Sequence, residues 1–493
     1  LVGWRPPERP VLCTGADVTA SVLPIRLHSG RRVQFDNLPP LSVYVHIPWC
    51  IRKCPYCDFN SHNAPADGVD ENAYLDALEA DLDACLPLIW GRRVVTVFIG
   101  GGTPSLFSGA AIDRLLASLR ARLPLLADVE VTMEANPGTF ERSRFADYRA
   151  AGVTRLSLGI QSFSDAKLKA LGRVHDSAQA RAAAEAAAGL FDTFNLDLMY
   201  ALPQQTLPEL REDLATALSF APPHLSCYHL TLEPNTLFAR FPPKVPDDDL
   251  AAAMLDTVGE MLGGTYENYE VSAWARPGHR AQHNLNYWMF GDYLGLGAGA
   301  HGKLSFPDRI IRQAKFRHPR RYMEAALAGH ACEIDEAVKP ADLPFEFMLN
   351  ALRLTEGVDA DLFADRTGLS SAVIRVKLRQ AIDRGLLVDD PLVLRPTPLG
   401  RNFLNDLLEI FLPDEPDREA GTGEEGSRRD PASREARAET GVGGPHVRNQ
   451  GAREVPVRVE RLAGDAAAPA AERQAEHGIT LPNGVVPLKR MEP

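Results

Sequence analysis

The sequence has 493 residues, which is long enough for two or more domains with a sizeable hydrophobic core. Lys and Arg total 53 and Asp and Glu total 65, so the formal net charge is -12. This acidic balance argues against bulk electrostatic binding to nucleic acid or to an anionic membrane surface. No apolar run approaches the roughly 18–20 residues needed to span a bilayer, and the first residues do not form a signal peptide. We therefore expect a soluble, cytoplasmic protein without an integral membrane segment.

The first stretch, residues 1–40, begins rich in Pro and Arg and shows no clear periodicity. It starts at Leu1 rather than at methionine, which suggests a processed, truncated or misassigned start. We interpret it as an extension that is poorly ordered up to about Asn37.

From residue 41 onward, β-prone runs alternate with runs of helical periodicity. The predicted strands cover residues 43–47, 94–99, 129–133, 155–160, 194–199 and 224–232. The predicted helices cover residues 72–86, 110–123, 142–151, 179–190, 208–220 and 247–262. Six βα units of about 30 residues each predict a parallel sheet with right-handed crossovers. A sheet of this kind that closes or nearly closes is a barrel, and its functional residues lie at the carboxyl ends of the strands.

The character of the sequence changes after Pro340. Helical patterns at 345–354, 361–368 and 371–385, followed by a hairpin at 386–394, predict a small helical domain similar to a winged helix. Winged helices often bind DNA, but the acidic balance argues against nucleic-acid binding here. Residues 413–493 are rich in Glu, Arg, Gly, Ala and Pro and are predicted to be a disordered tail. The predicted domains are thus 1–40, 41–305, 306–412 and 413–493.

Three of the seven cysteines, Cys50, Cys54 and Cys57, form a C-x3-C-x2-C loop directly after the first predicted strand. Three thiolates do not complete a tetrahedral zinc site, but they suit a [4Fe–4S] cluster that keeps one iron open for an outside ligand. A zinc loop with a distant fourth ligand, or reduced bystander cysteines, remain alternatives. The other four cysteines are scattered singly, which is typical of a reducing compartment rather than of a disulfide framework.

The residues around this loop, 44–49 before it and 58–62 after it, resemble the cluster loop of the radical S-adenosylmethionine superfamily. The chain is similar to the branch that contains oxygen-independent coproporphyrinogen III oxidases and the HemW-type heme chaperones. This resemblance covers about residues 38–412. It implies an α/β fold with a partial (β/α)6 barrel, open on one side, and a small C-terminal domain packed beside it. It also implies that S-adenosylmethionine chelates the open iron and is cleaved to methionine and a 5′-deoxyadenosyl radical after one-electron transfer.

The resemblance also implies a set of cofactor-binding residues. The run from Gly100 to Pro104 follows a strand and resembles the GGGTP motif, which contacts the methionine end of the cofactor. Matching positions carry binding roles over to Gly101, Gly102, Thr103, Glu134, Gln161, Arg173 and Asp197. Tyr44 and Tyr56 are expected to wall the site, and His301 is expected to contact the adenine. Without the resemblance, a tight turn at the glycines and a structural salt bridge at Glu134 remain open.

Two features distinguish the two kinds of relative. The oxidases carry a fourth cysteine two residues after the third, and this sequence has Phe59 there. Residues 283–288 also match the HNxxYW signature associated with the chaperones. This predicts a protein that binds heme and passes it to an unidentified acceptor, with a radical-type oxidase of a porphyrin precursor and a zinc-loop structural protein as the alternatives.

His283 is the candidate axial heme ligand, since imidazole commonly binds heme iron, and Tyr287 and Trp288 are candidates to pack on the porphyrin. The alternative interpretation is a buried His-Asn-Tyr-Trp cluster in the core. The sequence leaves open whether S-adenosylmethionine is cleaved productively and whether the chain forms a dimer.

Overall fold

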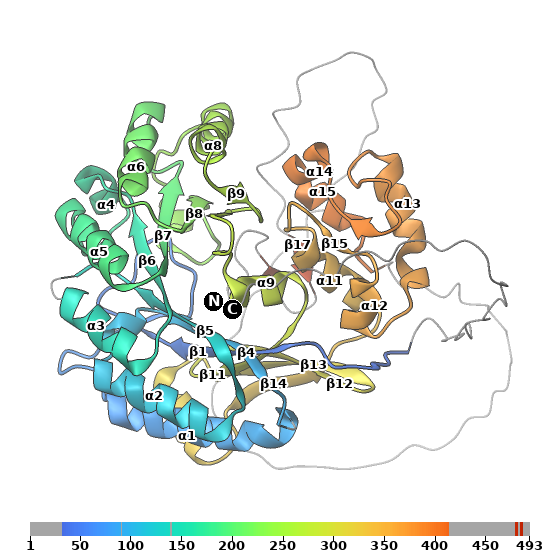
Figure 1. The fold of residues 1–493 in the computed structure, drawn as a ribbon, viewed down its shortest axis with the longest axis horizontal. Helices are drawn as coiled ribbons and strands as arrows, with labels where there is room; N and C mark the ends of the chain where they lie inside the picture. Colours follow the sequence, from blue (N-terminus) through green and yellow to red (C-terminus); the bar gives the residue numbers. More distant parts are fainter. Residues whose placement is uncertain (1–31, 90, 139–140, 414–478, 482–483, 487–493) are drawn as a thin grey trace, which may run out of the picture.

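The computed structural model describes residues 32–89, 91–138, 141–413, 479–481 and 484–486. Its main feature is a twelve-stranded sheet that curves into a horseshoe, with helices covering its outer face (Figure 1). The strand order is β14-β13-β12-β11-β1-β4-β5-β6-β7-β8-β10-β9. Because the end strands β14 and β9 do not pair with each other, the sheet is a partial barrel with one open side.

Seven neighbouring strands of this sheet run parallel. In spatial order they are β11 (Asp292–Leu296), β1 (Leu41–Ile47), β4 (Val94–Gly101), β5 (Leu125–Ala135), β6 (Arg155–Gln161), β7 (Thr193–Tyr200) and β8 (His224–His229). Six of them are the strands predicted from the sequence. The seventh, β11, pairs with β1 from the far end of the domain, which local periodicity does not reveal.

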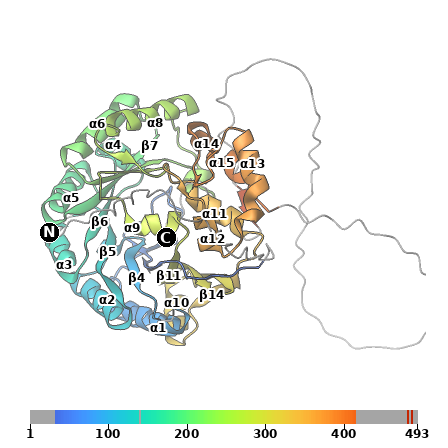
Figure 2. The ribbon, with the colours of Figure 1, turned by 45° about the vertical axis from the view of Figure 1, so that its right-hand side comes forward.

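The helices of the βα units lie on the outer face of the horseshoe, as Figure 2 shows. They are α1 (Glu71–Ile89), α2 (Gly109–Arg122), α3 (Glu141–Ala151), α5 (Ser177–Leu190), α6 (Leu207–Ser219) and α8 (Asp248–Leu262). Shorter elements join them: β2 (Trp49–Cys50), β3 (His62–Asn63), η1 (Pro104–Leu106), α4 (Asp165–Ala170) and α7 (Leu237–Arg240). The predicted alternation of strand and helix is therefore confirmed.

Side chains of the parallel strands alternate between two faces, because successive residues of a strand point to opposite sides of the sheet. On β1, Val43, Val45 and Ile47 belong to the core under the helices. The intervening Ser42 contributes its hydroxyl to the barrel interior, where Thr96 of β4 donates a 2.7 Å hydrogen bond to it. The horseshoe thus has an apolar outer layer that holds the helices and a polar interior that is available for chemistry.

The helix α9 (Gln282–Trp288) closes the lower end of this interior. It contacts β4, β5 and β11 and lies within the ring of strands in Figure 2. Glu130 lies within β5 and accepts hydrogen bonds from the backbone N–H groups of Gln282 and His283, which fixes the start of the helix. The amino ends of the strands are therefore plugged, and their carboxyl ends remain accessible.

The antiparallel strands extend the sheet beyond the predicted barrel boundary. On one side are β12 (His301–Phe306), β13 (Arg309–Lys315) and β14 (Cys332–Ala337), and on the other are β9 (Glu267–Asn268) and β10 (Ala273–Ala275). The helix α10 (Pro319–Leu327) packs on α1. The boundary expected between residues 305 and 306 falls inside the β12–β13 hairpin, so the sheet continues to Ala337.

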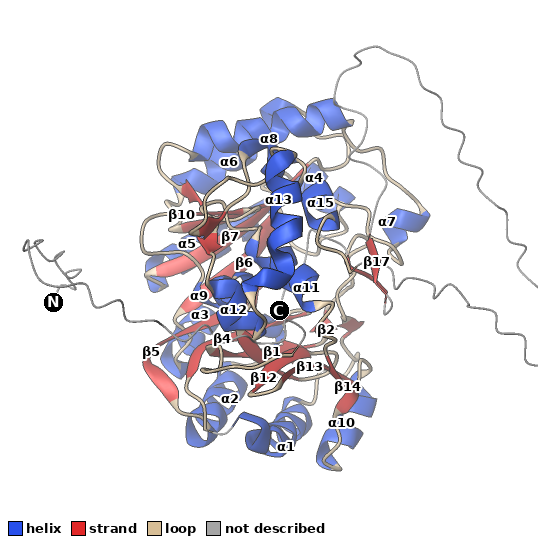
Figure 3. Ribbon diagram, turned by 90° about the vertical axis from the view of Figure 1, so that its right-hand side faces the viewer, coloured by secondary structure: helices blue, strands red, loops and turns tan. Residues whose placement is uncertain are grey.

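A second hydrophobic core begins after this sheet, from Leu343 onward. It holds α11 (Leu343–Ala351), β15 (Val358–Asp359), α12 (Leu362–Thr367), η2 (Ser371–Ile374), α13 (Arg375–Asp383), β16 (Val393–Leu394), α14 (Pro398–Asn402) and α15 (Leu404–Glu409). Figure 3, turned so that this side of the molecule faces the viewer, shows these mostly helical elements in front of the strands of the barrel. The expected small helical domain with a short hairpin is present.

The N-terminal extension is better packed than expected where it is described. Val33 and Phe35 are buried in the second core, and the Gln34 N–H donates to the Gly368 carbonyl. The sequence did not predict this contact, because residues 1–40 show no periodicity that would mark Val33 and Phe35 as core residues. Residues 1–31 and most of the predicted tail, 414–478, lie outside the described residues. Within the tail, the structure describes a short hairpin of β17 (Ile479–Leu481) and β18 (Gly484–Val486). Across the described ranges, none of the helices combines the length and apolar character required to cross a membrane.

Candidate functional site

A cavity of about 550 Å³ opens at the carboxyl ends of the parallel strands. This size is typical of small-molecule and cofactor sites. Its wall includes most of the predicted cofactor residues: Cys50, Cys54, Tyr56, Cys57, Gly101, Gly102, Thr103, Glu134, Gln161, Arg173 and Asp197. These residues come from the four neighbouring strands β4, β5, β6 and β7 and from the segments that follow strands, so the barrel topology brings together positions that span almost 150 residues of sequence.

The loop that carries the three cysteines is held by hydrogen bonds to its own backbone and to a neighbouring loop. The Lys53 ammonium donates to the Phe59 carbonyl at 2.8 Å, and the Cys57 N–H donates to the Cys54 carbonyl at 3.2 Å. The Arg52 guanidinium donates to the Gly172 carbonyl at 2.7 Å. The thiols are therefore presented by a fixed loop rather than by a free one.

All three thiols are free and partly accessible on the cavity wall. Burial raises the pKa of the Cys57 thiol to about 11, against the opposing effect of the Phe59 backbone N–H, and burial also raises the pKa of Cys50. Burial alone thus favours the protonated thiols. A bound cationic metal centre would favour the thiolates instead, because a thiol loses its proton when it becomes a metal ligand.

Among the described residues, no three His, Cys, Asp or Glu side chains are arranged around a single metal ion. Three thiols leave a tetrahedral zinc site incomplete, whereas they suit a [4Fe–4S] cluster whose fourth iron takes an outside ligand.

The glycine run after β4 approaches the cysteine loop closely. Gly101 has a φ of 115°, and a Cβ there would lie 2.6 Å from the His46 ring. A Cβ on Gly102 would lie 2.6 Å from the Trp49 carbonyl oxygen. Only glycine fits at both positions. The Gly101 N–H donates a 2.9 Å hydrogen bond to Glu134 Oε2, which anchors the run to the end of β5.

Asn136 connects two of the predicted cofactor residues and was not predicted itself. Its Nδ2 donates to Thr103 Oγ1 at 2.8 Å, and its Oδ1 accepts from Arg173 Nη2 at 2.5 Å. Arg173 also donates to the Gly159 carbonyl, while its buried Nε has no partner within the described part of the chain. Asn136 follows Glu134 by two residues, and this period of two along a strand end was the signal available for finding it.

Gln161 ends β6 in a conformation that is rare for a residue with a side chain. Its φ is 67°, and its buried Oε1 has no hydrogen-bond partner among the described residues. Asp213 of α6 supports the following turn by accepting hydrogen bonds from the Ser162 hydroxyl and the Phe163 N–H, both at 2.7 Å. Burial raises the pKa of Asp213 to about 6. A strained residue with an unpaired acceptor on a cavity wall is typical of a ligand-binding position.

Asp197 lies in β7, the strand that pairs with β6 beside Gln161. Ser157 donates to its Oδ2 at 3.1 Å, and Asn195 donates to its Oδ1 at 2.8 Å. A carboxylate oriented in this way retains acceptor capacity for hydroxyl groups of a ligand.

Comparison with known proteins gives the family. The radical SAM superfamily model matches residues 44–217, and the HemN C-terminal domain model matches residues 338–403. The heme chaperone HemW of Escherichia coli (strain K12) is 52% identical over 379 residues, which cover 76% of this chain and 99% of that protein. The chain belongs to the HemW family. The HemW protein of Haemophilus influenzae is 47% identical over 387 residues, covering 77% of this chain and 100% of that protein.

A solved structure supports the same fold for this HemW-family chain. Coproporphyrinogen III oxidase (HemN) from Escherichia coli, described as a radical SAM enzyme, aligns with a TM-score of 0.66 at 25% identity. The alignment covers 76% of this chain and 90% of HemN. The radical SAM fold and its C-terminal HemN-type domain are therefore confirmed.

Two predicted cofactor residues of this HemW-family chain do not line the cavity. Tyr44 is buried below it, where its hydroxyl lies 2.8 Å from His46 Nδ1 and its ring packs near Phe98. His301 begins β12 and is exposed. Tyr56 does lie on the wall and packs near Phe238 of α7. Tyr44 thus supports the floor of the site, and the predicted contact of His301 with adenine stays a prediction.

In the HNxxYW signature of this HemW-family chain, His283, Tyr287 and Trp288 are buried in α9, and no residue of the signature lines the cavity. His283 is fully buried, its Nδ1 lies 2.7 Å from Thr96 Oγ1, and its ring is 5.0 Å from that of Phe98. His283 Nε2, Tyr287 Oη and Trp288 Nε1 have no hydrogen-bond partner within the described ranges. Such atoms in a packed interior are of the type that internal water satisfies. The packing favours the core-cluster alternative over a porphyrin contact.

Proposed function

We propose that this protein is a heme chaperone that binds heme and passes it to acceptor proteins. The proposal rests on the 52% identity to a protein named heme chaperone HemW over 99% of its length. The geometric observation that carries it is Phe59, which lines the cavity at the position where the family resemblance places the fourth cysteine of the oxidases.

We also propose that the cavity holds a [4Fe–4S] cluster on Cys50, Cys54 and Cys57, with S-adenosylmethionine beside it. The unpaired, buried atoms Arg173 Nε and Gln161 Oε1 support a polar ligand at this wall. When bound, the cluster and S-adenosylmethionine would together supply one-electron chemistry at the sulfonium. The chain itself would contribute the Arg173 guanidinium to bind the carboxylate of S-adenosylmethionine, and Glu134 to bind its ammonium group.

The second candidate function is that of a coproporphyrinogen III oxidase-type radical enzyme. The structural likeness to HemN is the observation in its favour. Phe59 counts against it, because the resemblance places a cysteine of the oxidases at this position. The free cysteines and the oxygen sensitivity expected of an iron–sulfur cluster support a reducing, cytoplasmic location.

The test is anaerobic reconstitution of the cluster followed by titration with hemin, read by visible absorption. Decarboxylation of coproporphyrinogen III and release of 5′-deoxyadenosine are measured in parallel on the same preparation. We expect stoichiometric heme binding without decarboxylation. Decarboxylation without appreciable heme affinity would overturn the chaperone proposal in favour of the oxidase.

A further inference from the structure

A heme chaperone with this architecture needs a heme site outside the cofactor cavity. A cavity of about 550 Å³ that accommodates an iron–sulfur cluster and S-adenosylmethionine leaves little room for a porphyrin. His283, Tyr287 and Trp288 of the HNxxYW signature are buried in the core. The structure offers another surface with the right chemistry, directly at the mouth of the cavity.

Four large apolar side chains are exposed on the cavity wall or on the adjoining α7 segment, which docks on the cysteine loop, and we name them the apolar rim. They are Ile51 (64% exposed), Val174 (49%), Leu237 (58%) and Phe241 (66%). Ile51 and Val174 are also part of the cavity wall. Large apolar side chains that gather around a cavity mouth mark a binding surface more often than scattered ones do.

The contacts of Pro55 bring the two halves of the rim together. The Phe238 N–H of α7 donates a 3.0 Å hydrogen bond to the Pro55 carbonyl, which docks α7 on the cysteine loop. On its other side, Pro55 packs so closely on Gly172 that a Cβ there would lie 2.7 Å from its Cδ. Leu237 begins α7 and Phe241 is the residue that caps its end, and a 2.8 Å hydrogen bond from the Phe241 N–H to the Leu237 carbonyl holds the two residues one turn apart.

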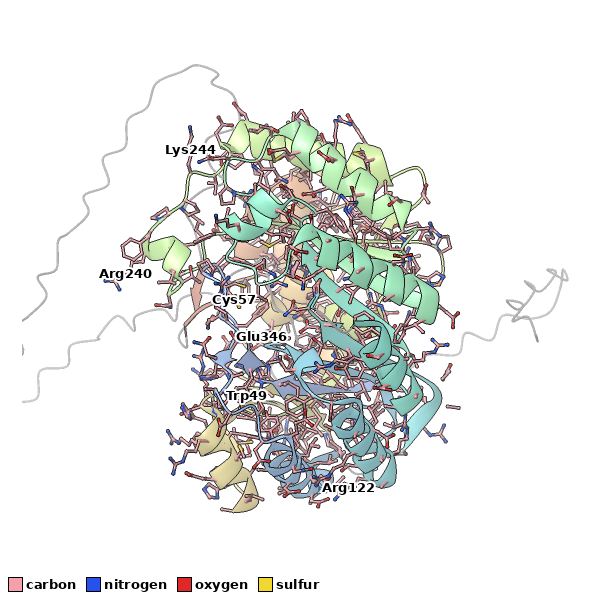
Figure 4. The ribbon with its side chains drawn as sticks, turned by 90° about the vertical axis from the view of Figure 1, so that its left-hand side faces the viewer. Trp49, Cys57, Arg122, Arg240, Lys244 and Glu346 are labelled. Carbon is pink, nitrogen blue, oxygen red and sulfur yellow. The ribbon has the colours of Figure 1, made fainter. Side chains whose placement is uncertain are left out.

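Cations flank this apolar surface in a protein whose net charge is -12. Arg240 lies with its guanidinium 5.2 Å from the centre of the Phe241 ring, and Arg52 projects from the cysteine loop. Figure 4 shows Arg240 and Lys244 protruding at the edge of the molecule on the side of Cys57. Within the described residues, neither Arg240 nor Lys244 has a carboxylate partner.

We propose that heme docks on the apolar rim, with its porphyrin face on Leu237 and Phe241 and its propionates near Arg240 and Lys244. This inference rests on the proposed chaperone function. Heme is a flat apolar ligand with two carboxylates at one edge, and the rim pairs exposed apolar side chains with neighbouring cations. A docked heme would also cover the mouth of the cavity, which places the cargo next to the cofactors.

The test compares hemin affinity of the full-length, cluster-loaded protein with that of two double variants. The rim variant is Leu237→Gln with Phe241→Gln. The matched control is Val376→Gln with Leu392→Gln, since these residues are 79% and 72% exposed on the C-terminal domain. We expect hemin affinity to fall by about tenfold to a hundredfold in the rim variant, because apolar contact area is lost. The control variant should bind hemin like the wild type.

Iron and sulfide content and S-adenosylmethionine affinity report whether the rim variant keeps its folded site. As a second measurement on the unmodified protein, hydrogen exchange with and without hemin should show protection in residues 233–245. Unchanged hemin affinity in the rim variant, or no protection in that segment, would overturn the rim proposal. If the wild type bound no hemin at all, the chaperone proposal itself would fail. If the rim variant bound hemin normally but lost transfer to an acceptor protein, the rim would be an acceptor-docking surface instead.

Discussion

The two ends of the barrel carry the two strongest sequence motifs and treat them in opposite ways. At the carboxyl ends of the strands, Cys50, Cys54 and Cys57 line an open cavity. At the amino ends, His283 and Tyr287 are buried in a helix that plugs the barrel. Both ends contain buried polar atoms without a hydrogen-bond partner in the described part of the structure. The two ends therefore differ in accessibility. Only the upper end, at the carboxyl ends of the strands, presents its unpaired atoms to a cavity that a ligand can enter.

This contrast teaches that motif identity does not by itself reveal a ligand site. A C-x3-C-x2-C loop and an HNxxYW helix are equally visible in the sequence, and both contain good ligands for iron. The environment decides which of them can act as a ligand. A side chain with no exposed surface must first lose its packing before it can bind anything large.

The largest effect is expected at the upper end. Cys54→Ala should abolish cluster binding, because the three thiols provide all of the predicted protein ligands. Iron and acid-labile sulfide analysis after anaerobic reconstitution measures this directly. Cys332→Ala is the matched control, since that thiol is also partly exposed but lies on β14. A Cys54→Ala protein that retained a full cluster would contradict the proposed donor set.

At the lower end, His283→Ala should act on stability rather than on heme. Removing a fully buried ring and its hydrogen bond to Thr96 is expected to lower the free energy of unfolding by about 2–4 kcal/mol. Chemical denaturation measures this loss, and hemin titration of the folded variant should give the wild-type spectrum and affinity. A changed heme spectrum with unchanged stability would reverse our interpretation and make His283 a heme ligand.

Acid should lower the stability of the fold, because two buried histidines at the lower end, His283 and His224, resist protonation. Burial lowers the pKa of His283 to about 3 and the pKa of His224 well below its usual value. Both are neutral in the folded chain but become protonated in the unfolded chain below about pH 6.5. Stability is thus lost as the pH falls below about 6.5, and His283 alone contributes a loss of roughly 2 kcal/mol at pH 5. Denaturation at pH 7 and pH 5 tests this, and His283→Gln should show a shallower pH dependence than the wild type.

The smallest of these effects concerns Asn136 at the upper end. Asn136→Ala removes the bridge between Thr103 and Arg173 and should weaken S-adenosylmethionine binding by about tenfold. Calorimetric titration of the cluster-loaded protein measures this, and the exposed Asn72→Ala on α1 serves as the control. Equal affinities in the two variants would mean that Arg173 is positioned without Asn136.

The sequence by itself determined the six βα units, the cysteine loop and the glycine run, because each depends on a pattern within a few residues. Period-two and period-3.6 alternation predicts strands and helices locally, and parallel strands necessarily bring their carboxyl ends to one edge. The positions of Glu134, Gln161 and Asp197 on one cavity wall followed from that rule together with the family resemblance.

Only the tertiary structure decided which partners meet from distant parts of the chain. It pairs β11 with β1, seals the HNxxYW helix inside the barrel, and packs Val33 and Phe35 on the second core. It also makes Asn136 a bridge and brings α7 against the cysteine loop. The physical reason is that burial and hydrogen bonding depend on neighbours in space, and a local pattern carries no information about a partner hundreds of residues away.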